Sequence, residues 1–152
     1  MPELTFRNAE EKDVPLILEF IKKLADYEHR LDEVIATEEA LKYWIFDKNQ
    51  AEVIFALEDG KEIGFAFFFL SFSTYIANVN MHLEDLFIDP EYRGKGYGCN
   101  GLLLLCETAK ANGIRELYDD IAIDNSSVAL FLKCGFVEVL RTTEYVLVKK
   151  EL

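Results

Sequence analysis

The chain has 152 residues, the length of one domain, and with 51% hydrophobic and 13% aromatic residues it can bury a large core. This composition excludes intrinsic disorder, collagen-like repeats and low-complexity structure. Acidic residues outnumber basic ones by 28 to 16, and the formal net charge of −12 argues against a general nucleic-acid-binding protein, because such a surface repels phosphate backbones.

The first half of the chain predicts one strand, two helices and three further strands. A strand over residues 4–7 precedes a helix that Asp13 caps and that ends near Tyr27, since apolar residues recur between them at helical spacing. Thr37 caps a second, short helix over 38–45. Asp59-Gly60 is typical of a hairpin turn, and apolar runs predict strands over 51–57, 61–72 and 78–88.

The second half alternates helices and strands. A glycine-rich segment over 89–98 leads into a helix over 99–112, which ends at Asn112-Gly113. A strand over 114–123 follows, then a helix from Ser126 to Lys133 and an antiparallel pair over 136–141 and 144–149. The order β-α-α-β-β-β-α-β-α-β-β predicts an α/β fold with a mixed sheet, in a single domain over 1–152.

Cysteine usage and the apolar segments bear on the environment of the protein. Cys99, Cys106 and Cys134 are an odd number without a CxxC pair, which favours reduced thiols over a disulfide framework or a zinc site. The N-terminus is charged, unlike a signal peptide, and the apolar stretch over 63–72 is far shorter than the roughly 20 residues of a membrane helix. We therefore expect a cytoplasmic protein that binds no membrane, nucleic acid or metal.

The glycine-rich segment, IDPEYRGKGYG over 88–98, joins a strand to a helix and is basic in an otherwise acidic chain. Glycines allow positive φ and close approach of backbone N–H groups, and a helix begins with unpaired N–H groups and a positive dipole end. Arg93 and Lys95 add positive charge. Together these features predict an anion site suited to a pyrophosphate.

Three phosphate-binding patterns were compared with this segment. A P-loop, G-x-x-x-x-G-K-[ST], is absent. The dinucleotide fingerprint G-x-G-x-x-G matches over 96–101, but residues 89–95 separate it from the strand, and too little chain follows for a doubly wound sheet. The pattern R/Q-x-x-G-x-G fits fully over 93–98. The remaining alternative is an ordinary glycine loop without a ligand.

The third pattern carries a resemblance to the GNAT superfamily of N-acetyltransferases, whose members hold the pyrophosphate of acetyl-CoA on this loop. The resemblance covers nearly the whole chain and is strongest to the diamine (spermidine/spermine) acetyltransferases. It is carried by IKKLADYE (21–28), EVIATEEAL (33–41), GFAFFF (64–69) and HLEDLFIDPEYRG (82–94). It implies a central, mixed, mostly antiparallel twisted sheet of about seven strands flanked by four helices, and a homodimer.

The resemblance also implies the site residues, with acetyl-CoA as the cosubstrate. The backbone of Leu86, Phe87 and Ile88 is expected to bind the pantetheine arm and to polarise the acetyl carbonyl. Glu84 corresponds to a catalytic carboxylate on the substrate side that acts through water, and Tyr27, Glu28 and Asp85 would bind the acceptor. The other residues implied to bind the coenzyme are Arg93, Gly94, Lys95, Gly96, Tyr97, Gly98, Cys99, Asn125, Ser127 and Phe131.

The residues themselves support a role for Glu84 and Asp85. Both lie in the apolar strand MHLEDLFI, where charges are costly unless they are paired or functional. Neighbours in a strand point to opposite faces, so without a bulge only one of them can face a given groove. Alternatively, one is a surface residue and the other the partner of an arginine. His29 and His82 are predicted to be structural or exposed.

The chain departs from the family late in the sequence, where N-x-x-A-x-x-F-Y-x-K-x-G-F places a tyrosine as general acid. With Lys133, Gly135 and Phe136 as anchors, Phe131 occupies the tyrosine position and Asp124 the asparagine position. Anchoring on Asn125 instead needs a one-residue deletion and places Leu132 there. Neither side chain donates a proton, so we expect a slower enzyme or a substitute acid such as Tyr118 or Tyr145.

The leading hypothesis is an N-acetyltransferase that moves an acetyl group from acetyl-CoA to the primary amine of a small cationic acceptor, by direct attack in a ternary complex. The acceptor would be a polyamine, a diamine or a lysine-like molecule, which an acidic surface attracts, although excess acid also serves solubility alone. Two alternatives stay open: acetylation of a protein amine, and an acyl-CoA-binding sensor with weakened catalysis.

Overall fold

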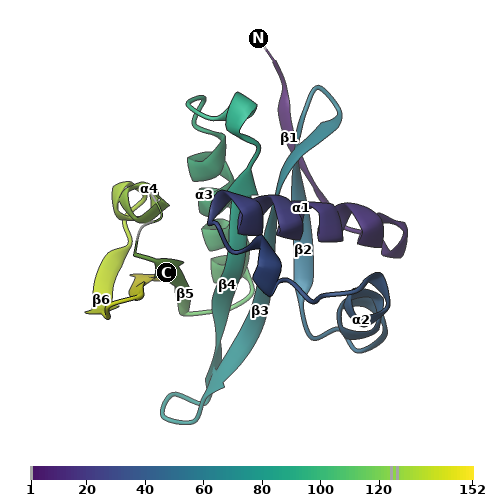
Figure 1. Ribbon diagram of the computed structural model, residues 1–152. Helices are drawn as coiled ribbons and strands as arrows, with labels where there is room; N and C mark the ends of the chain where they lie inside the picture. Colours follow the sequence, from purple (N-terminus) through teal and green to yellow (C-terminus); the bar gives the residue numbers. More distant parts are fainter. Residues whose placement is uncertain (1, 124, 126) are drawn as a thin grey trace. The chain divides into compact units, whose positions relative to one another are not determined.

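The helices and strands follow one another in the predicted order in the computed structural model of the chain (Figure 1), which describes residues 2–123, 125 and 127–152. Their bounds are β1 (Leu4–Asn8), α1 (Val14–Tyr27), α2 (Glu38–Lys42), β2 (Glu52–Glu58), β3 (Lys61–Ser73), β4 (Asn78–Ile88), α3 (Tyr97–Ala111), β5 (Glu116–Ala122), α4 (Ser127–Lys133), β6 (Val137–Arg141) and β7 (Tyr145–Glu151). The predicted α/β class is confirmed.

Two predicted helices differ in their bounds. The helix expected over 38–45 is an α-helix only to Lys42 and continues as one wider turn over Tyr43–Asp47, although Thr37 does cap it by accepting from the Ala40 N–H. The helix expected from Cys99 begins at Tyr97, because the left-handed Gly96 already serves as its N-cap. The predicted start of α4 at Ser126 lies outside the described residues.

The seven strands form one sheet in the order β1-β2-β3-β4-β5-β7-β6. β4 and β5 pair in parallel, whereas β1 with β2, β2 with β3, β5 with β7 and β6 with β7 are antiparallel. The sheet is therefore mixed and mostly antiparallel, as predicted. The turn between β2 and β3 is the expected hairpin, with positive φ at both Asp59 and Gly60.

The chain divides into two compact units, one comprising residues up to 68 together with 85–93, the other comprising 69–84 and 94–152. β3 and β4 each run through both units. The single domain over 1–152 stays a prediction.

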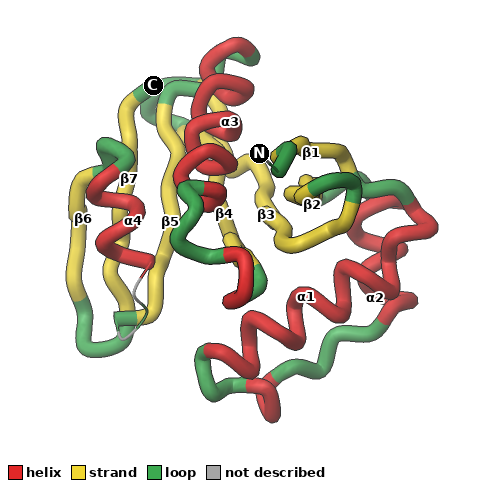
Figure 2. The backbone as a smooth tube through the Cα atoms, turned by 90° about the horizontal axis from the view of Figure 1, so that it is seen from above, coloured by secondary structure: helices red, strands yellow, loops and turns green. Residues whose placement is uncertain are grey.

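The first unit has an aromatic core between α1 and the strands. Ile17, Phe20 and Leu24 share one face of α1, as their spacing predicts, and all three are buried. Phe20 stacks on Phe65 with ring centroids 5.5 Å apart and also contacts Phe87 of β4. Figure 2 shows α1 and α2 on the same side of β1 and β2. The core thus packs the middle of α1 against the C-terminal part of β4.

The second unit buries one face of α3 against its strands. Leu102, Leu105, Cys106 and Ala109, which recur at helical spacing, are all buried. Alternate residues of β5 and β7 are buried as well, so each strand keeps one face in the core. Cys99, Cys106 and Cys134 are free thiols. Among the described residues, no helix is both long and apolar enough to span a bilayer.

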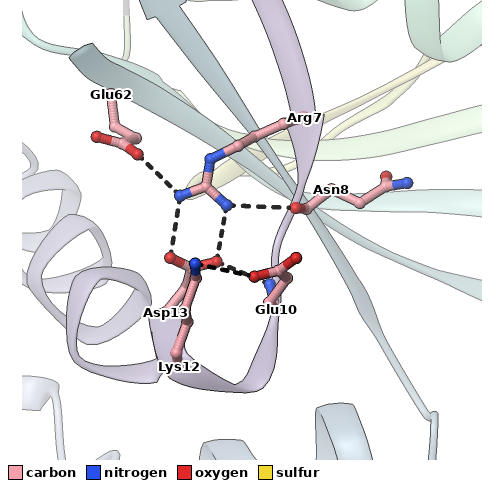
Figure 3. A network of polar contacts seen from close by, with 6 residues as sticks. All are labelled: Arg7, Asn8, Glu10, Lys12, Asp13 and Glu62. Carbon is pink, nitrogen blue, oxygen red and sulfur yellow. Dashed lines mark hydrogen bonds and ion pairs between the residues drawn. The ribbon is translucent and has the colours of Figure 1, made fainter. Parts of the chain in front are cut away.

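A network of charges joins β1 to the start of α1 and to β3 (Figure 3). The Arg7 guanidinium donates to both carboxylate oxygens of Asp13, at 2.8 and 2.9 Å, and to Glu62 at 2.8 Å. Asp13 also accepts from the Glu10 N–H, so its side chain serves this network rather than the first turn of α1. These bonds, above all those from Arg7, lower the pKa of Asp13 and of Glu62 below their ordinary values.

Arg7→Gln is expected to lower the free energy of unfolding by about 2 kcal/mol, because it leaves the Asp13 carboxylate buried without its cation. The lowered pKa values mean that this stabilisation is complete above about pH 4–5 and is lost as the pH falls through the folded-state values. Urea unfolding of both proteins between pH 3 and 7 measures this. Arg141→Gln, in an exposed pair with Glu138, should have a much smaller effect. Equal losses for the two variants would contradict the role of Arg7.

Candidate functional site

The glycine loop leads directly into α3 in the second unit. Gly94 and Gly96 have φ of 80° and 82°, and a Cβ added to either would meet open space. The left-handed backbone, not crowding, is therefore what favours glycine at these two positions. The Asn100 N–H donates to the Gly96 carbonyl, so the first turn of α3 starts here, with its positive dipole end at the loop. A helix start of this kind suits an anion, and pyrophosphate binding by this loop stays a prediction.

The residues after these glycines have packing roles as well. Tyr97 is buried, and the Lys95 ammonium lies 5.7 Å from the centre of its ring. A Cβ on Gly98 would lie 3.1 Å from Leu130 Cδ2, so the first turn of α3 packs closely against α4. Cys99 is hydrogen-bonded to the buried Cys134, and burial together with this bond raises the pKa of Cys134 to about 11. Coenzyme binding by this part of the loop stays a prediction.

Arg93, the first residue of the R-x-x-G-x-G pattern, is anchored in the first unit. Its Nε donates to the Ile88 carbonyl at 2.7 Å, and its guanidinium carbon lies 4.3 Å from the centre of the Tyr27 ring and 5.2 Å from that of Phe87. The structure therefore brings together Tyr27 and Arg93, two predicted site residues from the end of α1 and the start of the loop. Glu28, the C-cap of α1, follows Tyr27 directly.

The end of β4 approaches β3 unusually closely. Phe87 is buried in the aromatic core, and the Asp89 N–H donates to the Ile63 carbonyl at 2.8 Å. A Cβ on Gly64 would overlap the Phe87 carbonyl oxygen and lie 2.7 Å from Ile88 Cδ1. Only glycine allows this approach. Sequence reasoning missed Gly64, although a glycine inside an apolar strand is the signal that could have revealed it.

Glu84 lies on the part of β4 that belongs to the second unit, and its carboxylate is 56% exposed. His82, two residues earlier on the same face, places Nε2 3.8 Å from Glu84 Oε2 and 3.8 Å from Asp120 Oδ2 on β5. Sequence reasoning named neither His82 nor Asp120 as a site residue. Asp85 is half-buried in the first unit and takes part in interactions of its own.

The C-terminal positions implied by the resemblance lie around α4. Asn125 Oδ1 accepts from the Ser127 N–H at 2.8 Å and so holds the start of the helix. Phe131 is 1% exposed and packs edge-on against Phe136, so its ring belongs to the core, whereas Leu132 is 45% exposed. The assignment of Asp124 lies outside the described residues. Asn125, Ser127 and Phe131 as coenzyme ligands stay predictions.

Tyr118, the first suggested substitute acid, is held by charged neighbours on β5 and β7. Its hydroxyl donates to Glu116 at 2.8 Å, and Lys149 pairs with the same carboxylate at 3.1 Å. Burial and this bond raise the pKa of Tyr118 above its ordinary value. A raised pKa keeps the phenol protonated, as a general acid requires. Tyr145, the other suggestion, is half-buried on β7.

The described residues contain no group of three or more His, Cys, Asp and Glu side chains arranged to hold a metal ion. His82 and Glu84 of β4 and Asp120 of β5 combine one imidazole with two carboxylates, groups that can bind an organic cation or exchange a proton.

The chain is similar to a family of known proteins. Residues 18–136 match the model of the Acetyltransferase (GNAT) family. Thialysine N-epsilon-acetyltransferase of Bos taurus is 32% identical over 126 residues, which cover 77% of this chain and 74% of that protein. Spermidine/spermine N(1)-acetyltransferase-like protein 1 of Homo sapiens is 31% identical over 117 residues, covering 72% of this chain and 17% of that protein.

A similar fold is found among solved structures. PaiA N-acetyltransferase of Thermoplasma acidophilum, solved in complex with coenzyme A, has a TM-score of 0.73 and 20% identity, with 99% of each chain covered. This likeness extends over the seven-stranded sheet and the four helices, and it confirms the expected fold.

Proposed function

The chain belongs to the GNAT family of acetyl-CoA-dependent N-acetyltransferases, and we propose that it acetylates the primary amine of a small cationic acceptor: a polyamine, a diamine or a lysine-like molecule. The amine would attack the acetyl group directly in a ternary complex. The observation that carries this proposal is the 32% identity over 77% of the chain to an enzyme named for acetylating thialysine.

Charge supports a cationic acceptor. The formal net charge is −12, so the surface field attracts small cations. The side chains of Glu84 and Asp120 are both more than half exposed, and each carboxylate lies 3.8 Å from His82 Nε2. An ammonium group can therefore reach them from solvent. The relative named for spermidine and spermine fits the same acceptor chemistry.

The reaction requires the acceptor to lose a proton. An alkyl amine has a pKa near 10, as lysine does, and only its neutral form attacks a thioester, so deprotonation at pH 7 costs about 4 kcal/mol. In this proposal Glu84 first binds the ammonium and then accepts its proton, directly or through water. Acetyl-CoA supplies the acetyl thioester, and backbone groups of Leu86, Phe87 and Ile88 hold its pantetheine arm. The Ile88 carbonyl already accepts from Arg93.

Arg93→Lys is expected to weaken acetyl-CoA binding about tenfold. A lysine ammonium cannot lie over the Tyr27 ring as a planar guanidinium does and at the same time donate to the Ile88 carbonyl, so the loop would lose its anchor. Calorimetric titration of the purified protein with acetyl-CoA measures the change. The control Arg115→Lys replaces an exposed arginine just before β5 and should bind as wild type does. Equal affinities of wild type, Arg93→Lys and Arg115→Lys for acetyl-CoA would contradict this role of Arg93.

A thiol-release assay with acetyl-CoA tests the proposed function. Spermidine, spermine, short diamines, lysine and thialysine are compared with peptides that offer a free N-terminus or a lysine. Release with the small cationic amines, and little with peptides, is the expected result. Acetylation of peptides alone would favour a protein acceptor. Tight acetyl-CoA binding without release for any amine would favour the sensor, which the buried phenyl ring of Phe131 motivates.

The homodimer stays a prediction. Light scattering during size-exclusion chromatography tests it, with a mass of twice 17.5 kDa expected.

A further inference from the structure

We propose that His82 is a positioning residue that acts through Glu84 and takes over the proton that Glu84 removes from the acceptor, with Asp120 as the second carboxylate that stabilises the resulting imidazolium. This inference deepens the proposed function and rests on it. All the residues that carry it belong to the second unit.

The geometry places one ring nitrogen between two carboxylates. His82 Nε2 lies 3.8 Å from Glu84 Oε2 and 3.8 Å from Asp120 Oδ2. The imidazole also stacks on Phe69 of β3, with ring centroids 4.8 Å apart and an angle of 30° between the planes. The stack constrains the plane of the ring, and in this orientation Nε2 is the nitrogen nearest the two carboxylates. The ring itself is mostly buried, whereas both acids reach solvent.

Strand pairing explains why these groups meet. His82 and Glu84 alternate onto one face of β4, and Tyr118 of β5 is the register partner of His82. Asp120, two residues beyond Tyr118, lies on the same face. Leu83 and Asp119 occupy the other, buried face. The parallel pairing of β4 with β5 thus brings Asp120 to His82 from a position 38 residues later in the chain.

An imidazole beside Glu84 makes removal of the acceptor's proton more favourable. A glutamate side chain in a peptide is a weaker base than histidine by roughly two pKa units, and an alkyl ammonium has a pKa near 10. Glu84 alone would therefore accept the proton only fleetingly. An imidazole close by is the better final acceptor for that proton.

The proton moves from the acceptor to His82 in two steps. In the first, the N–H bond of the acceptor ammonium breaks and an O–H bond forms on Glu84, which leaves a neutral amine and a neutral carboxylic acid. In the second, that O–H bond breaks and the proton moves to the lone pair of His82 Nε2, which restores the Glu84 carboxylate and gives an imidazolium. A separation of 3.8 Å is bridged by one water or by a small rotation of the exposed Glu84 carboxylate.

Other titratable groups near the ring are already engaged. The Tyr118 hydroxyl donates to Glu116, and Lys149 of β7 pairs with that same carboxylate. From β3 the ring meets the apolar Phe69. Within residues 2–123, 125 and 127–152, the charged groups that contact His82 are Glu84 from β4 and Asp120 from β5.

Kinetics of His82 variants test the inference, with the best amine of the panel as substrate. His82→Gln should lower kcat by about 10- to 100-fold while the KM for the amine changes less than about threefold. The variant should also lose the inflection that an imidazole gives to kcat near neutral pH. A kcat within threefold of wild type, together with an unchanged pH profile, would overturn the proposal.

Three further variants separate chemistry from folding. His82→Phe keeps a ring to stack on Phe69 and should be as slow as His82→Gln, whereas wild-type activity would show that the ring nitrogen does not matter. In His82→Ala, added millimolar imidazole should restore part of the rate, and absence of rescue with a folded protein counts against the proposal. His29→Asn removes the chain's other histidine and should leave the pH profile unchanged.

A measurement without substrate keeps this inference distinct from the proposed function. NMR signals of the His82 ring nitrogens are compared in wild type, Glu84→Gln and Asp120→Asn. Each substitution should change the Nε2 signal, since each replaces a carboxylate that lies 3.8 Å from this nitrogen. Unchanged Nε2 signals in both variants would overturn the inferred contacts of His82. If no amine is acetylated, the proposed function and the proton route through His82 both fall, whatever the NMR signals show.

Discussion

Glu84→Gln is expected to lower kcat for the acceptor amine by about 100- to 1,000-fold, the largest effect on catalysis in this chain. The amide cannot accept a proton from the ammonium, and it also removes one of the two charges beside His82. The KM for the amine should rise severalfold, because the carboxylate also binds the ammonium form. Affinity for acetyl-CoA should not change. Steady-state kinetics and calorimetry on the same preparation measure these quantities.

Two control variants make this result specific. Glu138→Gln makes the same change at an exposed strand glutamate paired with Arg141, and its kcat should stay within twofold of wild type. Glu84→Asp keeps the charge on a shorter side chain and should retain more activity than Glu84→Gln. If Glu84→Gln turns over as fast as Glu138→Gln, the proton must leave the amine by another route.

Gly64→Ala should have the largest effect on stability, a loss of about 2–4 kcal/mol in the free energy of unfolding. The added Cβ would overlap the Phe87 carbonyl and meet Ile88, so β3 and β4 would have to move apart. This backbone is the segment proposed to hold the pantetheine arm. We therefore expect the melting temperature to fall by about 5–15 °C and acetyl-CoA affinity to fall with it.

Gly98→Ala is the matched control for this substitution. Its new Cβ would meet only Leu130 Cδ2 at 3.1 Å, the end of a flexible side chain, and alanine favours a helix over glycine. Its melting temperature should stay within a few degrees of wild type. A Gly64→Ala protein as stable as Gly98→Ala would show that the strands tolerate a side chain at position 64.

Local patterns accounted for much of the fold and for part of the candidate site. Helical spacing located the buried faces of α1 and α3, and Asp59-Gly60 located a hairpin, because such rules involve residues close together in sequence. The positive φ of Gly94 and Gly96 follows from the same kind of rule. The glycine loop also carries the resemblance to the GNAT family, and the model of that family matches residues 18–136.

The partners of the site residues did not follow from local patterns. Arg93 lies over Tyr27, 66 residues earlier in the chain, and the burial of Phe131 depends on its packing against Phe136. His82 was expected to be structural or exposed, and its stack on Phe69 is consistent with a structural role. Its place within 3.8 Å of Glu84 and Asp120 did not follow from local patterns.

Element order, turn positions and the glycine loop could be read from the residues alone, since periodicity and turn chemistry act within a few residues of one another. Which distant side chains share a face was decided only when β4 paired with β5 in one register. A shift of one residue would have turned Asp120 away from His82. The alternating burial of each strand disfavours such a shift but leaves shifts of two residues open, so only the paired strands show that Asp120 is the neighbour of His82.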